Sequence, residues 1–541
     1  MIPGLTDSWM LLLVVALPLG GALFALAMPH VDRLALRYVG LGTSGATAVV
    51  AVRAAWVAAH AAADAPLSFG LGDVIANRSG AAALLSLDGL AVPLLLSLVI
   101  ATPIALRSGA PRVFERTKFY VVTVLFAEGL LAAALVIDGA LLRLAVATMA
   151  SVPFFALVAL FGGPQRGTTT MRAAMIWLLV DLIALAVLAW LAARAGVDAP
   201  AATVNELRAG AASLSPALQP WIFLALAAPG LVRLAAGPFS VWLAAFLDEA
   251  PVSAVILAAC GAAPLGAHLL VRLALPVAPQ GLVVLLPWLC AIGALAVVLS
   301  GIIAIAERDL RRLLAQLLQS SGVVSALSLL CLGESGISAG TVHVVVAGAS
   351  AMWALTALEA TERRFETRDA VELAGLGKAV PLLATFLVLG LCSLTLVPGL
   401  GAGTTLWLAA RAIAVAPGLA AAGLPPLTSA WLALSLVVGA LLACAGVAAA
   451  ARRLLQPSPK KTRRIFDELN ASQAFRLFVP AAIALAAGLF ASSLIAVAAG
   501  PARAIVIRAR EGTGVLPDAA PFVPASSAPT LRAVGAEGAR P

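Results

Sequence analysis

Long apolar runs separated by short polar breaks repeat along the whole of this sequence. Many of these runs reach roughly 20 residues, enough for an α-helix to cross the roughly 30 Å hydrocarbon core of a bilayer. A membrane β-barrel would show short segments of alternating polarity instead. The pattern therefore predicts an all-α, polytopic membrane protein with about fourteen transmembrane helices.

The expected helices follow from the polar, Pro-rich and Gly-rich breaks between the runs. They are 8–28, 38–60, 86–106, 118–137, 140–162, 173–195, 219–246, 251–274, 281–305, 310–332, 338–360, 379–398, 403–450 as one or two spans, and 475–499. The run 8–28 has no basic segment before it and more spans after it, so it is expected to be a first helix rather than a cleaved signal.

The positive charges concentrate in short loops rather than on one face. The chain is 62% apolar and 11% charged, with a net charge of +9. Its basic loops are 107–118, 164–172, 307–312, 361–369 and 452–470. This is the distribution that sets membrane topology, so we expect the lipid bilayer, and not nucleic acid, as the partner of these charges. With an even number of helices, both termini would lie on the outer face of a bacterial-type inner membrane.

No segment outside the spans is long enough for a soluble domain that would hold a nucleotide or a flavin, so we expect no cofactor. The five cysteines lie in or beside apolar spans, without a CxxC motif or a paired histidine: Cys260, Cys290, Cys331, Cys392 and Cys444. They are interpreted as small packing residues, and no metal site is expected.

The segment 232–255, VRLAAGPFSVWLAAFLDEAPVSAV, is the most informative in the chain. Arg233 stands within an apolar run, where an ionisable group costs at least about 2.5–3.5 kcal/mol. Gly237-Pro238 then breaks the helix, which frees backbone carbonyls and admits water, as at midplane ion sites. Arg233 is either a structural cation paired with a neighbour or a fixed charge on an ion path. Asp248 and Glu249 are expected to be solvated or capping acids.

This segment resembles the seventh-to-eighth helix region of the antiporter-like proton-channel subunits of respiratory complex I, with Arg233 on the family's lysine. Other segments support the resemblance: SLDGLAVPLLL (86–96), AEGLLAAALVIDGALLRLAVATMASVP (127–153), RDLRRLLA (308–315), TERRFETRDAVELAGLGKAVP (361–381) and LVPGLGAG (396–403), the last holding a second break at Pro398-Gly399. The M-type subunit, the homologue of mitochondrial subunit 4, is the best match, since no long lateral helix follows the last span.

The resemblance implies a division of the chain and a fold. N-terminal helices occupy 1–117, the proton-conducting core 118–450, a loop and last helix 451–510, and a tail 511–541 whose composition predicts disorder. The core would contain two inverted five-helix repeats with broken helices. The family's carboxylate–lysine pairing makes Glu128 the expected partner of Arg233. Separation of such a pair would act as a switch for proton movement.

Four further residues are candidates for the proton pathway. His343 matches a family histidine, and a neutral imidazole can donate and accept at once; it could equally be a packing hydrogen-bonder. His268 aligns with an aromatic position, and Asp181 matches no family motif but could pair across helices. Thr148 stands where the family has a glutamate.

Other family charges are also replaced in this chain. Pro264 stands at a lysine position, Ser240 at a histidine and Leu406 at an acid or lysine. The hydrophilic axis of a conducting channel is therefore interrupted.

Three functions remain open. The first is a membrane-arm subunit of a complex I-like NADH:quinone oxidoreductase or a related hydrogenase, with proton translocation coupled to electron transfer in partner subunits. The second is a membrane subunit of an inorganic-carbon uptake system or a multisubunit cation/proton antiporter. The third is a non-conducting scaffold. All three imply other membrane subunits as partners. The missing charges favour the second and third, while the M-type motifs along the whole chain favour the first.

Overall fold

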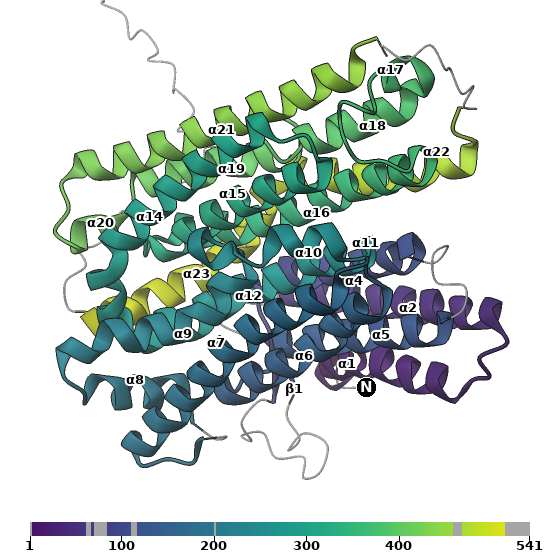
Figure 1. Ribbon diagram of the computed structural model, residues 1–541. Helices are drawn as coiled ribbons and strands as arrows, with labels where there is room; N and C mark the ends of the chain where they lie inside the picture. Colours follow the sequence, from purple (N-terminus) through teal and green to yellow (C-terminus); the bar gives the residue numbers. More distant parts are fainter. Residues whose placement is uncertain are drawn as a thin grey trace, which may run out of the picture.

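A computed structural model describes residues 3–60, 66–69, 84–109, 116–199, 202–457 and 468–513. The predicted tail 511–541 lies almost wholly outside these residues. The described chain is a bundle of long helices that run roughly side by side (Figure 1). Fourteen helices are long and apolar enough to cross a membrane, or fifteen if one bent pair is counted as a span. The predicted all-α fold with about fourteen spans is confirmed.

The N-terminal half contains α1 (Pro3–Ala27), α2 (Arg33–His60), α4 (Ala91–Gly109), α5 (Thr117–Val136), α6 (Ala140–Phe161), α7 (Arg166–Ala195), α8 (Val204–Ala212), α9 (Gln219–Arg233), α10 (Leu243–Glu249), α11 (Val252–Leu257), α12 (Ala263–Leu269) and α13 (Leu275–Val277). Short turns lie between some of them: η3 (Pro216–Leu218), η4 (Gly237–Ser240) and the π-helical η5 (Ala258–Ala262) and η6 (Leu270–Ala274). A small antiparallel ribbon pairs β1 (Leu67–Phe69) with β2 (Leu85–Leu87).

The C-terminal half contains α14 (Pro279–Ala306), α15 (Leu310–Leu330), α16 (Glu334–Phe365), α17 (Leu376–Ala379), α18 (Pro381–Cys392), α19 (Ala402–Ala414), α20 (Pro417–Ala421), α21 (Pro426–Leu455), α22 (Ala471–Leu489) and α23 (Ala491–Thr513). The run 403–450 is thus two helices, α19 and α21. The last predicted helix, 475–499, is too short: α22 and α23 together begin earlier and end later. α23 packs against α16, α14 and α4, so this segment joins both halves.

Both predicted helix breaks are present. α9 and α10 are bent by 46° around the Gly237-Pro238 turn, where Ala235 and Gly237 have positive φ angles of 52° and 59°. Between α18 and α19 the chain is non-helical around Pro398-Gly399, and Gly399 has a φ of 79°. Following the chain from span to span, α9–α10 and α18–α19 run in opposite directions, as expected of inverted repeats.

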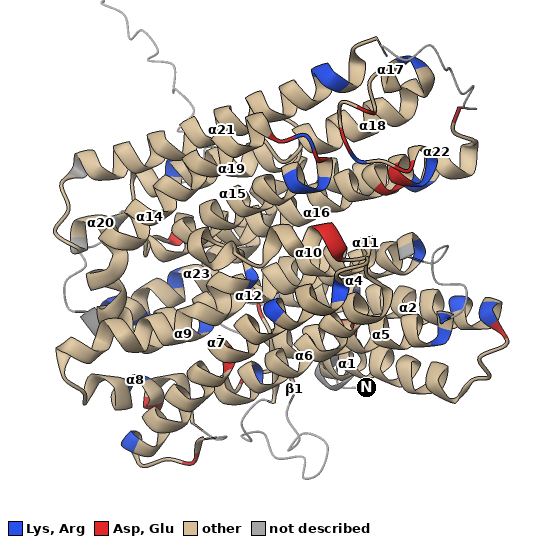
Figure 2. Ribbon diagram, in the orientation of Figure 1, with Lys and Arg blue, Asp and Glu red and all other residues tan. Residues whose placement is uncertain are grey.

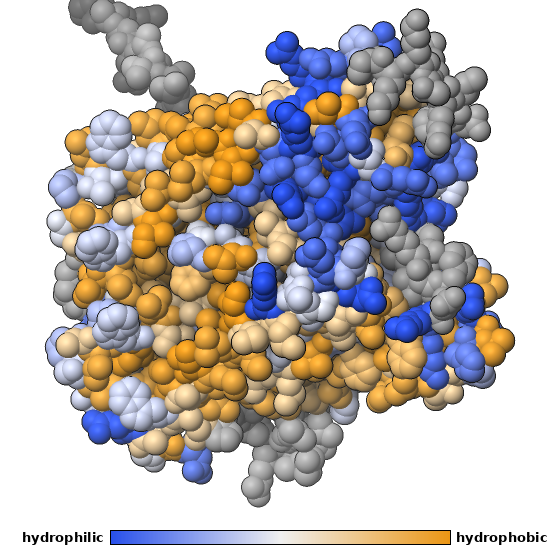
Figure 3. Space-filling view, viewed as in Figure 1, coloured by the Kyte–Doolittle hydropathy of each residue, from blue (hydrophilic) through white to orange (hydrophobic). Residues whose placement is uncertain are grey.

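The described residues of the basic loops meet at one end of the bundle, here called the polar end. The Gly163 amide donates to the Glu249 carbonyl, Arg363 contacts the Ser108 carbonyl, and Arg453 donates to the Glu307 carbonyl. Charged residues gather at this end in Figure 2, and Figure 3 shows a hydrophilic area there beside apolar flanks. Arg208, in α8 at the opposite end, donates to the carbonyl of Arg508 in α23.

Burial separates the central helices from the peripheral ones. α5, α15, α16 and the α11–α13 segment are almost entirely buried. On α7 and α14, by contrast, large apolar side chains such as Leu179, Trp288 and Leu295 are exposed, as they would be against lipid. The central helices carry Glu128, His268 and His343, so these polar groups lie away from the apolar surface.

Candidate functional site: a buried ion pair at a broken helix

Arg233 lies in the last turn of α9, directly before the break, and its side chain is 1% exposed. Its partner is Asp181, in the middle of α7. Nη1 and Nη2 of Arg233 each donate to one carboxylate oxygen of Asp181, both at 2.7 Å. Two parallel bonds between a guanidinium and a carboxylate form the strongest geometry for such a pair.

The pairing of Arg233 with Glu128 that the family resemblance implied is wrong. Arg233 pairs with Asp181, while the hydroxyl of Ser44 in α2 donates to Glu128 Oε1 at 3.0 Å. The other carboxylate oxygen of Glu128 has no hydrogen-bond partner among the described residues. The physical reason is that Asp181 meets both guanidinium nitrogens, so the charge of Arg233 is already compensated on the α7 side.

The remaining surroundings of Arg233 also hold it in place. Nη1 donates to the Pro229 carbonyl at 3.1 Å, and Nη2 to the Ala147 carbonyl at 3.3 Å. The guanidinium lies 5.0 Å from the ring centroid of Trp177, within the range of a cation–π contact. Thr148 does not join this site through its hydroxyl, which donates to the Leu144 carbonyl of its own helix.

A small cavity of about 50 Å³ adjoins Arg233. α10, α11, α15 and α16 contribute to its wall, so it lies between the first broken helix and the C-terminal half. Ser321 and Ser325 of α15 line it, and the Ser325 hydroxyl has no partner among the described residues. A cavity with polar groups and this volume has room for a few water molecules.

His343 lies at the second broken helix. Its Nδ1 is 2.9 Å from the hydroxyl of Thr405 in α19, and that hydroxyl donates to the Ala402 carbonyl. Because a hydroxyl has a single proton and that of Thr405 is directed to Ala402, we assign Nδ1–H as the donor to Thr405, which leaves Nε2 as an acceptor. Nε2 has no partner within the described part of the chain. The residue after Thr405 is Leu406, which is buried and cannot carry a proton.

His268 and Glu128 are both buried and apart from the ion pair. Neither ring nitrogen of His268 has a hydrogen-bond partner among residues 3–60, 66–69, 84–109, 116–199, 202–457 and 468–513. Arg143 of α6 is buried as well, and it donates to the Ile137 and Asp138 carbonyls at the end opposite the polar end. Sequence reasoning missed Arg143, although a charged residue within an apolar run was the available signal.

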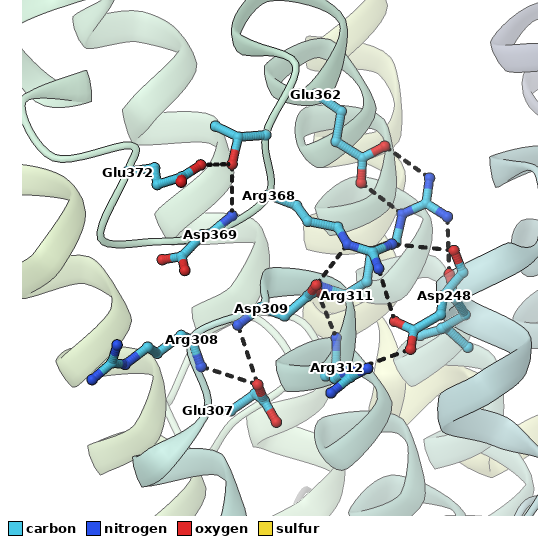
Figure 4. A network of polar contacts seen from close by, with 12 residues as sticks. Asp248, Glu307, Arg308, Asp309, Arg311, Arg312, Glu362, Arg368, Asp369 and Glu372 are labelled. Carbon is cyan, nitrogen blue, oxygen red and sulfur yellow. Dashed lines mark hydrogen bonds and ion pairs between the residues drawn. The ribbon is translucent and has the colours of Figure 1, made fainter. Parts of the chain in front are cut away.

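The polar end contains an ion-pair network that sequence reasoning also missed (Figure 4). Arg311 makes two bonds to the Glu362 carboxylate, of 2.6 and 2.8 Å, and donates to the Leu247 and Ala250 carbonyls at 2.9 and 3.0 Å. It thereby fixes the end of α10 to α15 and α16. The signal in the sequence was the mixture of acids and bases in loops that were interpreted only by their net positive charge.

Asp248 belongs to the same network and is not simply solvated. It pairs with Arg312 at 3.1 Å and with Arg368 at 3.3 Å, and Arg368 also pairs with Asp309 at 2.6 Å. The carboxylate of Glu249 accepts a hydrogen bond from the backbone N–H of Gln165 at 2.8 Å. The turn after the first broken helix is thus held from both halves of the bundle.

The described residues contain no group of three or more His, Cys, Asp or Glu side chains that could hold a metal ion. The candidate site consists of one buried ion pair, a small cavity, and a histidine against the helix that follows the second break.

Comparisons with known proteins agree with this architecture. The family described as NADH:quinone oxidoreductase/Mrp antiporter, transmembrane, matches residues 146–414. NAD(P)H-quinone oxidoreductase chain 4-2 of Synechocystis sp. is 24% identical over 400 residues, 72% of this chain and 68% of that protein. NADH-quinone oxidoreductase subunit M of Rhodobacter capsulatus is 23% identical over 240 residues, 43% of this chain and 46% of that protein.

Solved structures show the same fold. A chain of respiratory complex I from Thermus thermophilus superposes with a TM-score of 0.76 at 20% identity, covering 94% of this chain and all of the other. A chain of an archaeal membrane-bound sulfane sulfur reductase superposes with a TM-score of 0.76 at 16% identity, covering 94% of this chain and 99% of the other. A chain of the Mrp complex from Dietzia sp. gives 0.72 at 18% identity, with 93% of this chain and 55% of the other covered.

Proposed function

Because this chain belongs to the NADH:quinone oxidoreductase/Mrp antiporter family of membrane subunits, we propose that it is a membrane-arm subunit of a complex I-like quinone oxidoreductase. In this role it takes part in proton translocation, while electron transfer occurs in partner subunits. The names of its relatives support this assignment. The observation that carries it is the buried Arg233–Asp181 ion pair at the end of a broken helix, beside a cavity that reaches the C-terminal half.

In this proposal Asp181 is the member of the pair that exchanges a proton. Arginine effectively never releases its proton, whereas a carboxylate can be neutralised. A proton on Asp181 would remove the charge that holds Arg233, and the guanidinium would be free to turn toward the cavity. The pair is thus a switch with one fixed and one titratable charge.

The rest of the path would run through neutral groups. Ser321 and Ser325 line the cavity, and α16 contributes Val344, which follows His343, to the same wall. Water in the cavity would connect these hydroxyls. His343 does not line the cavity, so its Nε2 would accept a proton through a further connection beyond the cavity wall. His268 and Glu128 are buried polar groups nearer the N-terminal helices, and we assign them to branches of the path rather than to the ion pair.

A scaffold that does not conduct is the second candidate, and specific residues favour it. Thr148, Ser240 and Leu406 stand where the resemblance implies charges, and Leu406 beside Thr405 is buried and apolar. Such a subunit would extend the membrane arm and transmit no protons. An Mrp-type antiporter or an inorganic-carbon uptake system is the alternative assembly, in which the same fold would serve another complex.

We place the protein in a bacterial-type inner membrane with the polar end facing the cytoplasm, because positive loops stay on that side. Both ends of the chain would then lie on the outer face. A cysteine introduced at Arg172, near the polar end of α7, would be labelled by an impermeant reagent only after the membrane is opened.

Purification of the tagged full chain in mild detergent tests the assembly. Recovery of NADH-oxidising and iron–sulfur subunits together with other membrane-arm subunits would support the respiratory assignment. Recovery of antiporter subunits, or of one unrelated soluble partner, would overturn it. Proton uptake by the reconstituted complex then distinguishes a conducting subunit from a scaffold. Asp181→Asn abolishes quinone-linked proton movement if the subunit conducts protons, and leaves it unchanged if the subunit is a scaffold.

A further inference from the structure

A second, larger cavity lies at the polar end, away from the ion pair. It has a volume of about 330 Å³ and lies between α2, α4, α16 and α22. Its apolar wall consists of Leu41, Pro103, Ile104, Leu477, Val479 and Pro480. The volume falls in the range of small-molecule binding pockets. The proposed proton path does not use this cavity.

The rim of this cavity is strongly basic. Among the described residues, four arginines line it, Arg107, Arg363, Arg364 and Arg476, together with one carboxylate, that of Glu359. Glu359 is bonded to Arg363 at 2.5 Å. Arg107 of α4, Arg363 of α16 and Arg476 of α22 line the same cavity, so three like charges converge on it from three helices. Like charges that converge in this way favour an anion between them.

We infer that this cavity binds the phosphate headgroup of an anionic phospholipid, with the start of its acyl chains against the apolar wall. The arginines supply planar donors that suit a phosphate. Basic pockets between transmembrane helices at the cytoplasmic side are typical sites for anionic lipid headgroups. Phe475 on α22 lines the cavity and is 61% exposed, so an apolar ring stands beside the basic rim.

The combination of rim and wall is the reason for choosing a lipid rather than free phosphate. A free anion needs only the arginines and gains nothing from the apolar residues beneath them. A phospholipid uses both surfaces, and the bilayer presents its headgroup at the height where the helices end. The lipid would fix α22 to α4 and α16, and so join the last span to both halves.

Native mass spectrometry of the purified full chain tests this inference. The protein is incubated with phosphatidylglycerol or with phosphatidylcholine, and the lipids retained on it are counted. The wild-type chain retains phosphatidylglycerol in preference. Arg107→Gln/Arg476→Gln binds it about twenty-five-fold more weakly, because each of the two cations near an anionic lipid contributes about fivefold. Arg172→Gln, an exposed arginine on α7 near the same end, is the matched control and leaves retention unchanged.

A second variant keeps every arginine and fills the cavity. Ala360→Trp places a ring in the lining, and retention of phosphatidylglycerol falls while the melting temperature without lipid stays near that of the wild type. Equal retention of the two lipids by the wild-type chain would overturn the inference, as would full retention by the double arginine variant. Displacement of the lipid by excess inorganic phosphate alone would also overturn it, because the acyl chains would then contribute nothing.

Discussion

The guanidinium of Arg233 and the carboxylate of Asp181 face one another across α9 and α7, with two contacts of 2.7 Å and side chains that are 1% and 0% exposed. A buried pair of this kind is satisfied only while both members are charged. Its removal from water is costly, and the cost is offset only by good geometry and additional hydrogen bonds. The bonds to the Pro229 and Ala147 carbonyls supply the latter.

Asp181→Asn is expected to destabilise the protein by about 3–5 kcal/mol, because it leaves a buried guanidinium without its counter-charge. Thermal unfolding in detergent measures the change. The double variant Asp181→Asn/Arg233→Gln removes both charges and is expected to recover a large part of the loss. Equal melting temperatures for the single and double variants would contradict a direct charge pair between these residues.

Arg233→Lys introduces the residue type that the family resemblance implies at this position and tests the fixed charge. Lysine titrates when it is desolvated, whereas arginine does not. Proton translocation by the reconstituted complex is therefore expected to become more dependent on pH than in the wild type, with some loss of stability because one ammonium cannot make the paired contacts. Arg233→Gln is the control without charge. A pH profile identical to that of the wild type would contradict a direct role of this cation in the path.

The sequence was sufficient for the number of helices and for both breaks, because apolar length and the Gly-Pro and Pro-Gly pairs are local signals. It was not sufficient for the partner of Arg233. Asp181 and Glu128 are both single acids in apolar runs, and only the packing of α7 against α9 decides between them.

The pairing within the polar-end network could not be predicted from the sequence either. Acids and bases in separate loops were visible in the sequence, but their pairing depends on where the helices end. The last span was also predicted too short, since residues 471–474 and the segment after Gly500, with Pro501 and several arginines, resemble loop sequence yet are helical in the structure.

Gly322 of α15 tests the contact between the first break and the C-terminal half. A Cβ atom at this position would lie 1.8 Å from the Leu234 carbonyl oxygen, which is backbone and cannot easily move. Gly322→Ala is therefore expected to cost at least about 1–3 kcal/mol and to disturb the cavity beside Arg233. Gly45→Ala on α2 is the control, because nothing lies within 4 Å of its added Cβ. The melting temperature should fall only for Gly322→Ala.

Thr405→Val tests the tautomer of His343. The substitution removes the acceptor of the Nδ1 proton, and a buried unsatisfied group costs about 1–3 kcal/mol. Thr405→Ser keeps the hydroxyl and is expected to behave like the wild type in both stability and proton translocation. If Thr405→Ser lost as much translocation as Thr405→Val, the hydroxyl would not be the functional group.

Arg311 and Arg312 are neighbours in sequence with different surroundings, which gives a matched test of the polar-end network. The Arg311 side chain is 7% exposed and bonded to Glu362 and two carbonyls, while that of Arg312 is 54% exposed and bonded to Asp248. Arg311→Gln is expected to cost about 3 kcal/mol, as for other buried pairs that lose one partner. Arg312→Gln is expected to cost less than about 1 kcal/mol, as for surface pairs.

Thermal unfolding in detergent and limited proteolysis of the loops near Asp248 and Arg368 measure both variants. Because Arg311 binds the Leu247 and Ala250 carbonyls, its loss should release the turn between α10 and α11 and expose it to protease. The Arg312 variant should keep this turn protected. Equal sensitivity of the two variants would mean that the turn is held by packing, and that the two halves of the bundle are not joined through Arg311.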